Sequence, residues 1–129
     1  MPKGLYMQFI LPIRDQENQL EQILANTEAF LSYLNREIRD VIAGLDESSP
    51  SDKDLLLVDD GSQDSTKAMA EYYIDGRDVG LISHERPMGY GYVFADALKY
   101  SNDMGQSIMV LLNGEALLND KMFSYMSGL

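Results

Sequence analysis

The sequence contains no cysteine, one histidine, and about half as many basic as acidic residues. Without cysteine, neither a disulfide nor a thiolate metal site can form, which fits a reducing compartment. The 10 basic and 21 acidic residues give a formal net charge of −11, so the clustered cations that neutralise nucleic-acid phosphates are missing. No apolar run approaches the roughly 20 residues that cross a bilayer. These absences predict a cytoplasmic protein that binds no nucleic acid and has no membrane span.

The remaining composition is typical of a globular domain. The chain has 129 residues, of which 45% are hydrophobic, and this is enough for one sizeable core. Its N-terminus leads into a short apolar strand rather than a signal peptide. We therefore expect a single domain over residues 1–129.

Apolar patterns predict strands and helices in regular alternation along the chain. Pro12 is expected to end the first strand, because proline cannot donate to a ladder. The expected strands are 5–11, 55–58, 79–83 and 107–112; the expected helices begin near Glu17, at Asp64 or Ser65, and at Gly89. Gly44 is expected to end the first helix, residues 46–53 to form a surface loop, and residues 117–126 to form a last amphipathic segment. This order predicts an α/β fold, a three-layer α/β/α sandwich with a mainly parallel sheet.

The most informative segment begins with the second expected strand. Residues 55–58 are apolar without alternation, which indicates a strand covered on both faces. Asp59 and Asp60 follow directly, and a turn at Gly61 and Ser62 comes next. Ligands bind outside the carboxyl ends of parallel strands, so we expect the two acids to hold a polar ligand. The alternative is a helix-capping loop, in which these residue types serve only the turn.

Residues 58–66, Val-Asp-Asp-Gly-Ser-Gln-Asp-Ser-Thr, resemble the VDDGSxDxT motif of family 2 glycosyltransferases, nucleotide-sugar enzymes of GT-A fold. Weaker resemblances follow in the family's order. Residues 10–12 with Asp15 resemble its first strand and turn, residues 89–91 the glycine-rich start of its third helix, and residues 108–112 the strand before its Asp-x-Asp motif. The resemblance covers essentially the whole chain, but only about the first half of a typical family domain. It implies a Rossmann-like GT-A nucleotide-binding half, truncated relative to the family.

The resemblance also implies a site for a nucleoside diphosphate sugar and an inverting transfer of that sugar. Carboxylates suit the base and ribose because they accept hydrogen bonds from N–H and hydroxyl groups. Glycines allow the backbone to come close to a ligand. The nucleotide-binding residues implied in this way are Pro12, Arg14, Asp15, Asp59, Asp60, Gly61, Ser62, Gly89 and Gly91.

The sequence departs from the family at the metal motif. In the family, Asp-x-Asp binds Mg²⁺ or Mn²⁺, hard cations that prefer oxygen ligands. Here Asn113-Gly114-Glu115 stands in that place, a degenerate form with one carboxylate and one amide oxygen. We expect Asn113 and Glu115 to hold a divalent cation weakly; the alternative is an Asn-Gly turn after a strand. Pro87 and Gln16 also replace an Asn and a Glu of the family.

Two functional hypotheses follow. No catalytic residue is assigned, because the family's catalytic base belongs to its second half. The chain is either the donor-binding half of a glycosyltransferase, completed by a missing C-terminal segment or another subunit, or a non-catalytic remnant that binds a nucleotide or a partner protein. An uncovered sheet edge further predicts a homo-oligomer. His84 has no partner nearby in the sequence and is expected to be a loop or surface residue.

Overall fold

The computed structural model describes residues 7–37, 50–103, 105 and 108–119. The helices and strands are β1 (Met7–Ile13), α1 (Leu20–Glu37), the 3-10 turn η1 (Asp52–Asp54), β2 (Leu55–Asp60), α2 (Thr66–Ile74), β3 (Gly80–His84), α3 (Tyr90–Asp103), β4 (Ile108–Leu111) and α4 (Gly114–Leu117).

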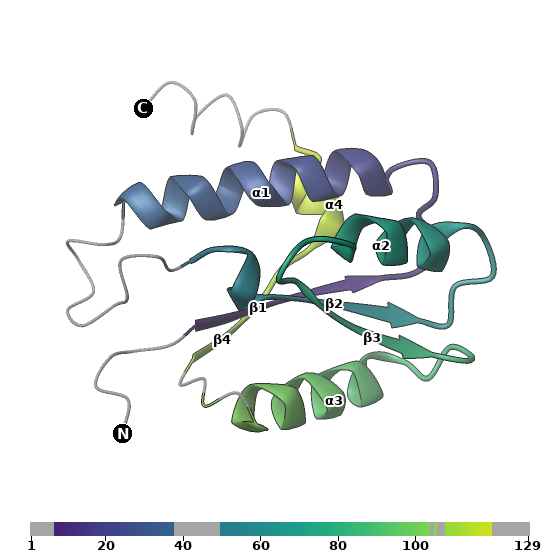
Figure 1. The fold of residues 1–129 in the computed structure, drawn as a ribbon. Coiled ribbons are helices and arrows are strands. Elements are labelled where there is room, and N and C mark those ends of the chain that lie inside the picture. The colour runs from purple at the N-terminus through teal and green to yellow at the C-terminus, as the bar shows by residue number, and fades with distance from the viewer. Residues whose placement is uncertain (1–6, 38–49, 104, 106–107, 120–129) are drawn as a thin grey trace.

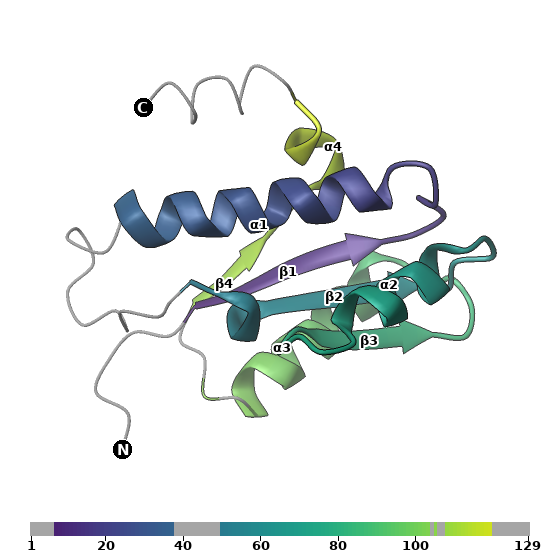
Figure 2. The ribbon, with the colours of Figure 1, turned by 45° about the horizontal axis from the view of Figure 1, so that its top comes forward.

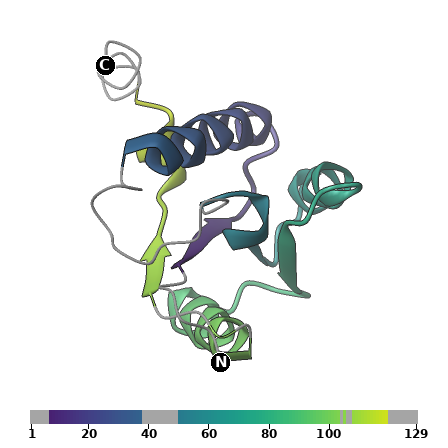
Figure 3. The ribbon, with the colours of Figure 1, turned by 60° about the vertical axis from the view of Figure 1, so that its left-hand side comes forward.

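The four strands form one parallel sheet in the order β3-β2-β1-β4. Helices α1, α2 and α4 lie on one face of this sheet, and α3 lies on the other (Figures 1 and 3). The arrowheads of β1, β2 and β3 point toward the same end of the molecule (Figure 2). The predicted α/β fold, with a mainly parallel sheet between helix layers, is confirmed.

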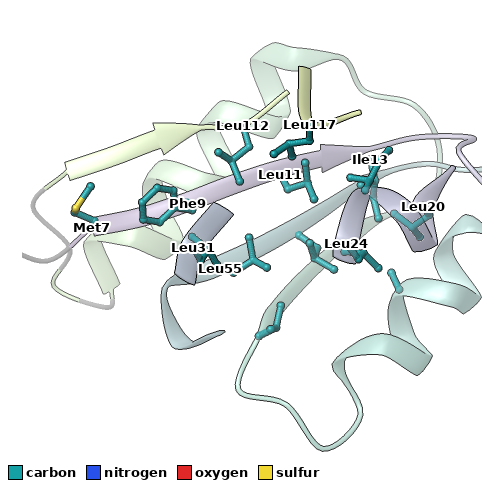
Figure 4. Close-up of a cluster of buried hydrophobic side chains, with 14 residues drawn as sticks. Met7, Phe9, Leu11, Ile13, Leu20, Leu24, Leu31, Leu55, Leu112 and Leu117 are labelled. Carbon is teal, nitrogen blue, oxygen red and sulfur yellow. The ribbon is translucent and has the colours of Figure 1, made fainter. Parts of the chain in front are cut away.

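The core consists of two apolar clusters, one on each face of the sheet. The larger cluster lies under α1 and includes Phe9 and Leu11 of β1 (Figure 4). The smaller cluster joins Ile10 and Val58 to Val93 of α3. Successive side chains of a strand point to opposite faces, so β1 and β2 must be apolar on both. The unbroken apolar run before the acid pair reflects this double burial.

Strand β2 carries the acid pair as its last two residues, beyond the end expected from the sequence. Leu57 packs in the cluster under α1, whereas Val58 packs in the cluster under α3. The alternation therefore directs Asp59 toward the α1 and α2 layer and Asp60 toward α3. The two acids are neighbours in sequence but face opposite sides of the sheet.

The expectation that Pro12 ends the first strand is wrong, because β1 continues to Ile13 and pairs Pro12 with Val58. Ile10 accepts a hydrogen bond from the amide of Leu112, which follows β4. Alternate residues of a strand direct their backbone groups to the same side. The missing N–H of Pro12 therefore faces the β4 side, at the point where β4 ends, and not β2.

The helix boundaries differ from expectation by a few residues. Helix α1 begins at Leu20 rather than near Glu17. A turn precedes it, in which the amides of Gln19 and Leu20 donate to the carbonyl of Gln16. Its expected end at Gly44, residues 46–49 of the expected loop and residues 120–126 of the expected last segment lie outside the described residues. Within the described part of the chain, no helix is both long and apolar enough to span a membrane.

Candidate functional site

A cavity of about 700 Å³ lies at the carboxyl ends of β1, β2 and β4. Its wall is formed by the segment that ends β1, by Asp60 at the end of β2, by residues 111–115 after β4, and by the start of α3. Strand β1 lies between β2 and β4 in the sheet. Asp60 of the acid turn and the Asn-Gly-Glu bend therefore line one cavity.

The cavity brings together part of the predicted set of residues and leaves the rest outside. The predicted residues that line it are Pro12, Arg14, Asp60, Gly89, Asn113 and Glu115. The predicted residues that do not line it are Asp15, Asp59, Gly61, Ser62 and Gly91.

Asp60 is the carboxylate that β2 presents to the cavity. Its Oδ1 accepts hydrogen bonds from Nδ1 of His84 and from the amide of Met88, both at 2.8 Å. Its Oδ2 accepts from the amide of Gly89 at 3.0 Å. A carboxylate has about four acceptor positions, so these three bonds from described residues leave one position on Oδ2. Asp60 therefore holds the start of α3 and also lines the cavity.

Asp59 is fully buried on the opposite face and does not line the cavity. Its Oδ1 accepts a hydrogen bond from the hydroxyl of Ser62, and its Oδ2 has no hydrogen-bond partner among the described residues. This side chain organises its own turn and is out of reach of a ligand in the cavity.

The polar residues of the acid-turn motif mainly connect two loops. The amide of Asp15 donates to the hydroxyl of Ser62 at 2.9 Å, and the amide of Gln63 donates back to Oδ1 of Asp15 at 2.7 Å. The amide of Gln16 donates to Oγ1 of Thr66 at 2.7 Å. Asp15 adopts a left-handed backbone with φ of 48°, which Asp tolerates better than most residues. These bonds fix the loop after β1 against the loop after β2.

Gly61 is the point where a third loop meets these two. Its φ is +71°, a conformation that favours glycine. A Cβ at this position would lie 2.1 Å from the carbonyl carbon of Arg86 and 2.3 Å from the nitrogen of Pro87. Only a residue without a side chain allows the loop before α3 to pack this closely.

His84 is the functional candidate that the sequence did not reveal. It ends β3, opposite Asp60 in the register, and its side chain is only 11% exposed. Nδ1 lies 2.8 Å from Asp60, and Nε2 lies 2.6 Å from Oδ2 of Asp96 on α3. Asp60 is the main cause of a raised His84 pKa; burial opposes this, and Asp96 adds to the increase. The i, i+12 spacing to Asp96 carries no recognisable sequence signal.

The residues at the degenerate metal motif have unequal roles. Oδ1 of Asn113 accepts hydrogen bonds from the amides of Glu115 and Ala116, at 2.8 and 3.2 Å, and so caps α4. This occupies both lone pairs of the amide oxygen. Glu115 is exposed and lines the cavity. Among the described residues, no group of three acidic, histidine or cysteine side chains converges on a metal position. Of the two residues, Glu115 is the one whose carboxylate oxygens could ligate a hard cation.

The rest of the wall combines one cation with an aromatic surface. Arg14 is the one basic residue among the described residues that line the cavity, and its side chain is half exposed. Tyr90 and Phe94 lie one turn apart on α3 with their ring centroids 6.1 Å apart. Tyr90 is 66% exposed. A positive group and an open ring therefore face the same cavity.

Comparisons with known proteins agree with the sequence resemblance. The chain is similar to the structure described as "Crystal structure of S. aureus TarS 1-349", with a TM-score of 0.50 and 19% identity over 92% of this chain. It spans 32% of the length of that chain. No curated protein gives a significant match. The family described as "Glycosyl transferase family 2" matches residues 26–121, which include the acid turn, α3 and β4. The chain belongs to glycosyl transferase family 2.

Proposed function

We propose that the cavity binds a nucleoside diphosphate sugar and serves as the donor site of an inverting glycosyl transfer. The observation that carries this proposal is the cavity itself, in which polar groups from three parallel strand ends and the aromatic start of α3 face one space. Family membership supports this substrate class, and the location agrees with the general position of ligands in open α/β sheets.

The lining residues suggest a role for each part of such a donor. The free acceptor position of Asp60 suits a ribose hydroxyl or a base N–H. The exposed ring of Tyr90 suits stacking with the base, a contact worth about 1–3 kcal/mol. Arg14 offers the charge that a diphosphate needs in a chain with a net charge of −11.

The proposal includes a divalent cation, Mg²⁺ or Mn²⁺, with Glu115 as its protein ligand. This carboxylate would hold the ion together with the phosphate oxygens, while Asn113 keeps its capping role. When bound, the cation would neutralise charge on the leaving diphosphate.

In the proposed reaction, the oxygen of an acceptor hydroxyl forms a bond to the anomeric carbon. The bond from that carbon to the diphosphate oxygen breaks, and the nucleoside diphosphate leaves with the electron pair. The hydroxyl proton passes to a general base. No described residue is assigned this role.

A second candidate function is a non-catalytic nucleotide-binding domain. Two observations favour it: Asn113 acts as a helix cap, and the described residues contain no cluster of three metal-ligating side chains. Both candidate functions require the donor site, and they differ only in turnover.

Calorimetric titration with UDP and with GDP, each with and without Mn²⁺, tests the donor site. We expect one of the two to bind, and Tyr90→Ala to weaken it about tenfold through the lost stacking contact. Tyr72→Ala is the matched control, because Tyr72 is 85% exposed on α2 and does not line the cavity. Failure of both nucleotides to bind the wild-type protein would contradict the donor site. Release of sugar from the corresponding nucleotide sugars would rule out the non-catalytic alternative.

The proposal also includes self-association in the cytoplasm through the edge strand β4. Within the described residues, β4 pairs only with β1, and its Ile108, Met109 and Leu111 are 37–47% exposed. Open backbone groups beside apolar side chains form a surface to which a second strand can pair.

Sedimentation velocity over a wide concentration range tests this association. We expect the wild-type protein to form dimers and Met109→Lys to shift the population toward monomer, because a lysine on an edge strand disfavours pairing. Tyr72→Lys places the same charge on α2 and should leave the distribution unchanged. A wild-type protein that remains monomeric at every concentration would contradict the proposed interface.

A further inference from the structure

His84 lies between two carboxylates, an arrangement that favours a proton on both ring nitrogens. The distances are 2.8 Å from Nδ1 to Asp60 and 2.6 Å from Nε2 to Asp96. Ionised carboxylates only accept hydrogen bonds, and a neutral imidazole has a single N–H. A neutral ring would therefore turn a lone pair toward one carboxylate at close range. The imidazolium form donates to both and satisfies the arrangement.

The carboxylate–imidazole bridge, formed by Asp60, His84 and Asp96, connects three elements of the fold. Asp60 comes from β2, His84 from β3, and Asp96 from the second turn of α3. Asp60 also accepts the amides of Met88 and Gly89, which lead into α3. The bridge therefore holds the end of β2, the loop before α3 and α3 itself in one arrangement.

This arrangement determines one wall of the cavity. Asp60, Gly89 and Tyr90 line the cavity, whereas His84 does not. Gly89 has a φ of +91°. The hydrogen bonds from the Met88 and Gly89 amides to Asp60 attach this turn to the end of β2.

We propose that His84 is a positioning residue whose doubly protonated ring orients Asp60 and, through Asp60, fixes the Met88–Gly89 turn at the wall of the cavity. It acts through Asp60 and does not touch the ligand. The proposal makes the shape of the site dependent on pH near neutrality, because histidine is the side chain that titrates there.

The expected pH window follows from the direction of each pKa. Asp60 and Asp96 are the charged groups that act on the ring, and together they raise the His84 pKa above its usual value near 6.5 despite burial. The bridge is thus complete below about pH 6.5 and is lost as the pH rises through the folded-state pKa. Burial alone would raise the pKa of Asp60, but the bonds from His84, Met88 and Gly89 outweigh it and lower the value. The bridge is also lost in acid. The loss begins as the pH falls below the usual aspartate pKa of about 3.9, and it continues as the pH falls through the lowered pKa of Asp60.

NMR titration of the free protein tests the bridge directly, since His84 is the only histidine and its ring signals need no assignment by mutation. We expect a midpoint above about 6.5, with both ring N–H protons protected from exchange below it. As the pH rises through this midpoint, the hydrogen-exchange protection factors of the Met88 and Gly89 amides should fall at least about tenfold. A midpoint at or below 6.5, or amides that do not respond at that midpoint, would overturn the proposal.

Asp96→Asn separates positioning from simple packing. The variant keeps an acceptor near Nε2 but removes the charge, so we expect the His84 midpoint to fall by about one pH unit. The pH midpoint at which the Gly89 amide loses its protection from hydrogen exchange should fall by the same amount. Asp103→Asn makes the same change at an exposed position of α3 and should leave both midpoints in place. Midpoints that stay unchanged in Asp96→Asn would also contradict the bridge.

The consequence for ligand binding rests on the proposed donor site and is measured separately. Affinity for UDP or GDP should fall about tenfold as the pH rises through the His84 midpoint, and His84→Asn, which cannot titrate, should remove that dependence. Binding that is independent of pH across the midpoint would overturn the positioning role while the donor site stands. If neither nucleotide binds at any pH, the donor site fails, and the NMR titration alone decides the bridge.

Discussion

Gly61→Ala is expected to be the most destabilising single-methyl substitution in the acid turn. The new Cβ would lie 2.1 Å from the carbonyl carbon of Arg86, so the backbone of the loop before α3 must move. The positive φ of +71° adds conformational strain. Together these effects should cost about 3–5 kcal/mol of unfolding free energy and lower Tm by roughly 10–20 °C. Calorimetric or circular-dichroism melting measures the change.

Gly76→Ala is the matched control for this variant. Gly76 has nearly the same φ, +79°, but no atom of the described residues lies within 4 Å of the position that its Cβ would take. Gly76→Ala should therefore lower the free energy of unfolding only through the strain of the positive φ, by about 1–2 kcal/mol. Equal losses in the two variants would mean that the contact between Gly61 and the loop before α3 does not contribute to stability.

Asp60→Asn is expected to affect both stability and ligand binding. The amide keeps one acceptor oxygen, but the substitution removes the charge that holds His84 and the amides of Met88 and Gly89. Breaking a buried charged network of this kind should cost about 3 kcal/mol. Nucleotide affinity should fall more than about tenfold, because the free acceptor position and the wall of the cavity are lost together.

Asp59→Asn distinguishes the two neighbouring acids. Asp59 is also buried but faces the other side of the sheet and does not line the cavity. We expect this variant to leave nucleotide affinity within about twofold of the wild-type value, measured by the same titration on folded protein. A larger loss of affinity in Asp59→Asn than in Asp60→Asn would reverse the assignment of the ligand-facing acid.

The fold was largely predictable because the controlling signals are local. Doubly buried strands need apolar residues on both faces, and the unbroken run 55–58 shows this directly. Pro12 misled the prediction because its effect depends on the strand beside it, and the early end of β4 is not encoded near Pro12. Strand ends follow from pairing partners, which lie far away in the sequence.

The site was predictable in position but not in the role of each side chain. Asp59 and Asp60 look equivalent in the sequence, yet the period of two in a strand separates them onto opposite faces. Ser62 and Asp15 resemble ligand-binding residues but are hydrogen-bonded to each other's loops. His84 seemed isolated because its partner Asp96 becomes a neighbour only once α3 packs on the sheet. Roles that depend on long-range contacts require coordinates.

Backbone NMR mapping of a nucleotide titration, with UDP or GDP in the presence of Mg²⁺, tests the central claim most directly. The donor-site proposal predicts that the largest chemical-shift changes occur at Arg14, Gly89, Tyr90 and Glu115, the residues that share the cavity. Changes confined to the groove between α1 and α2, around Met69 and Tyr72, or no changes at saturating nucleotide, would contradict it.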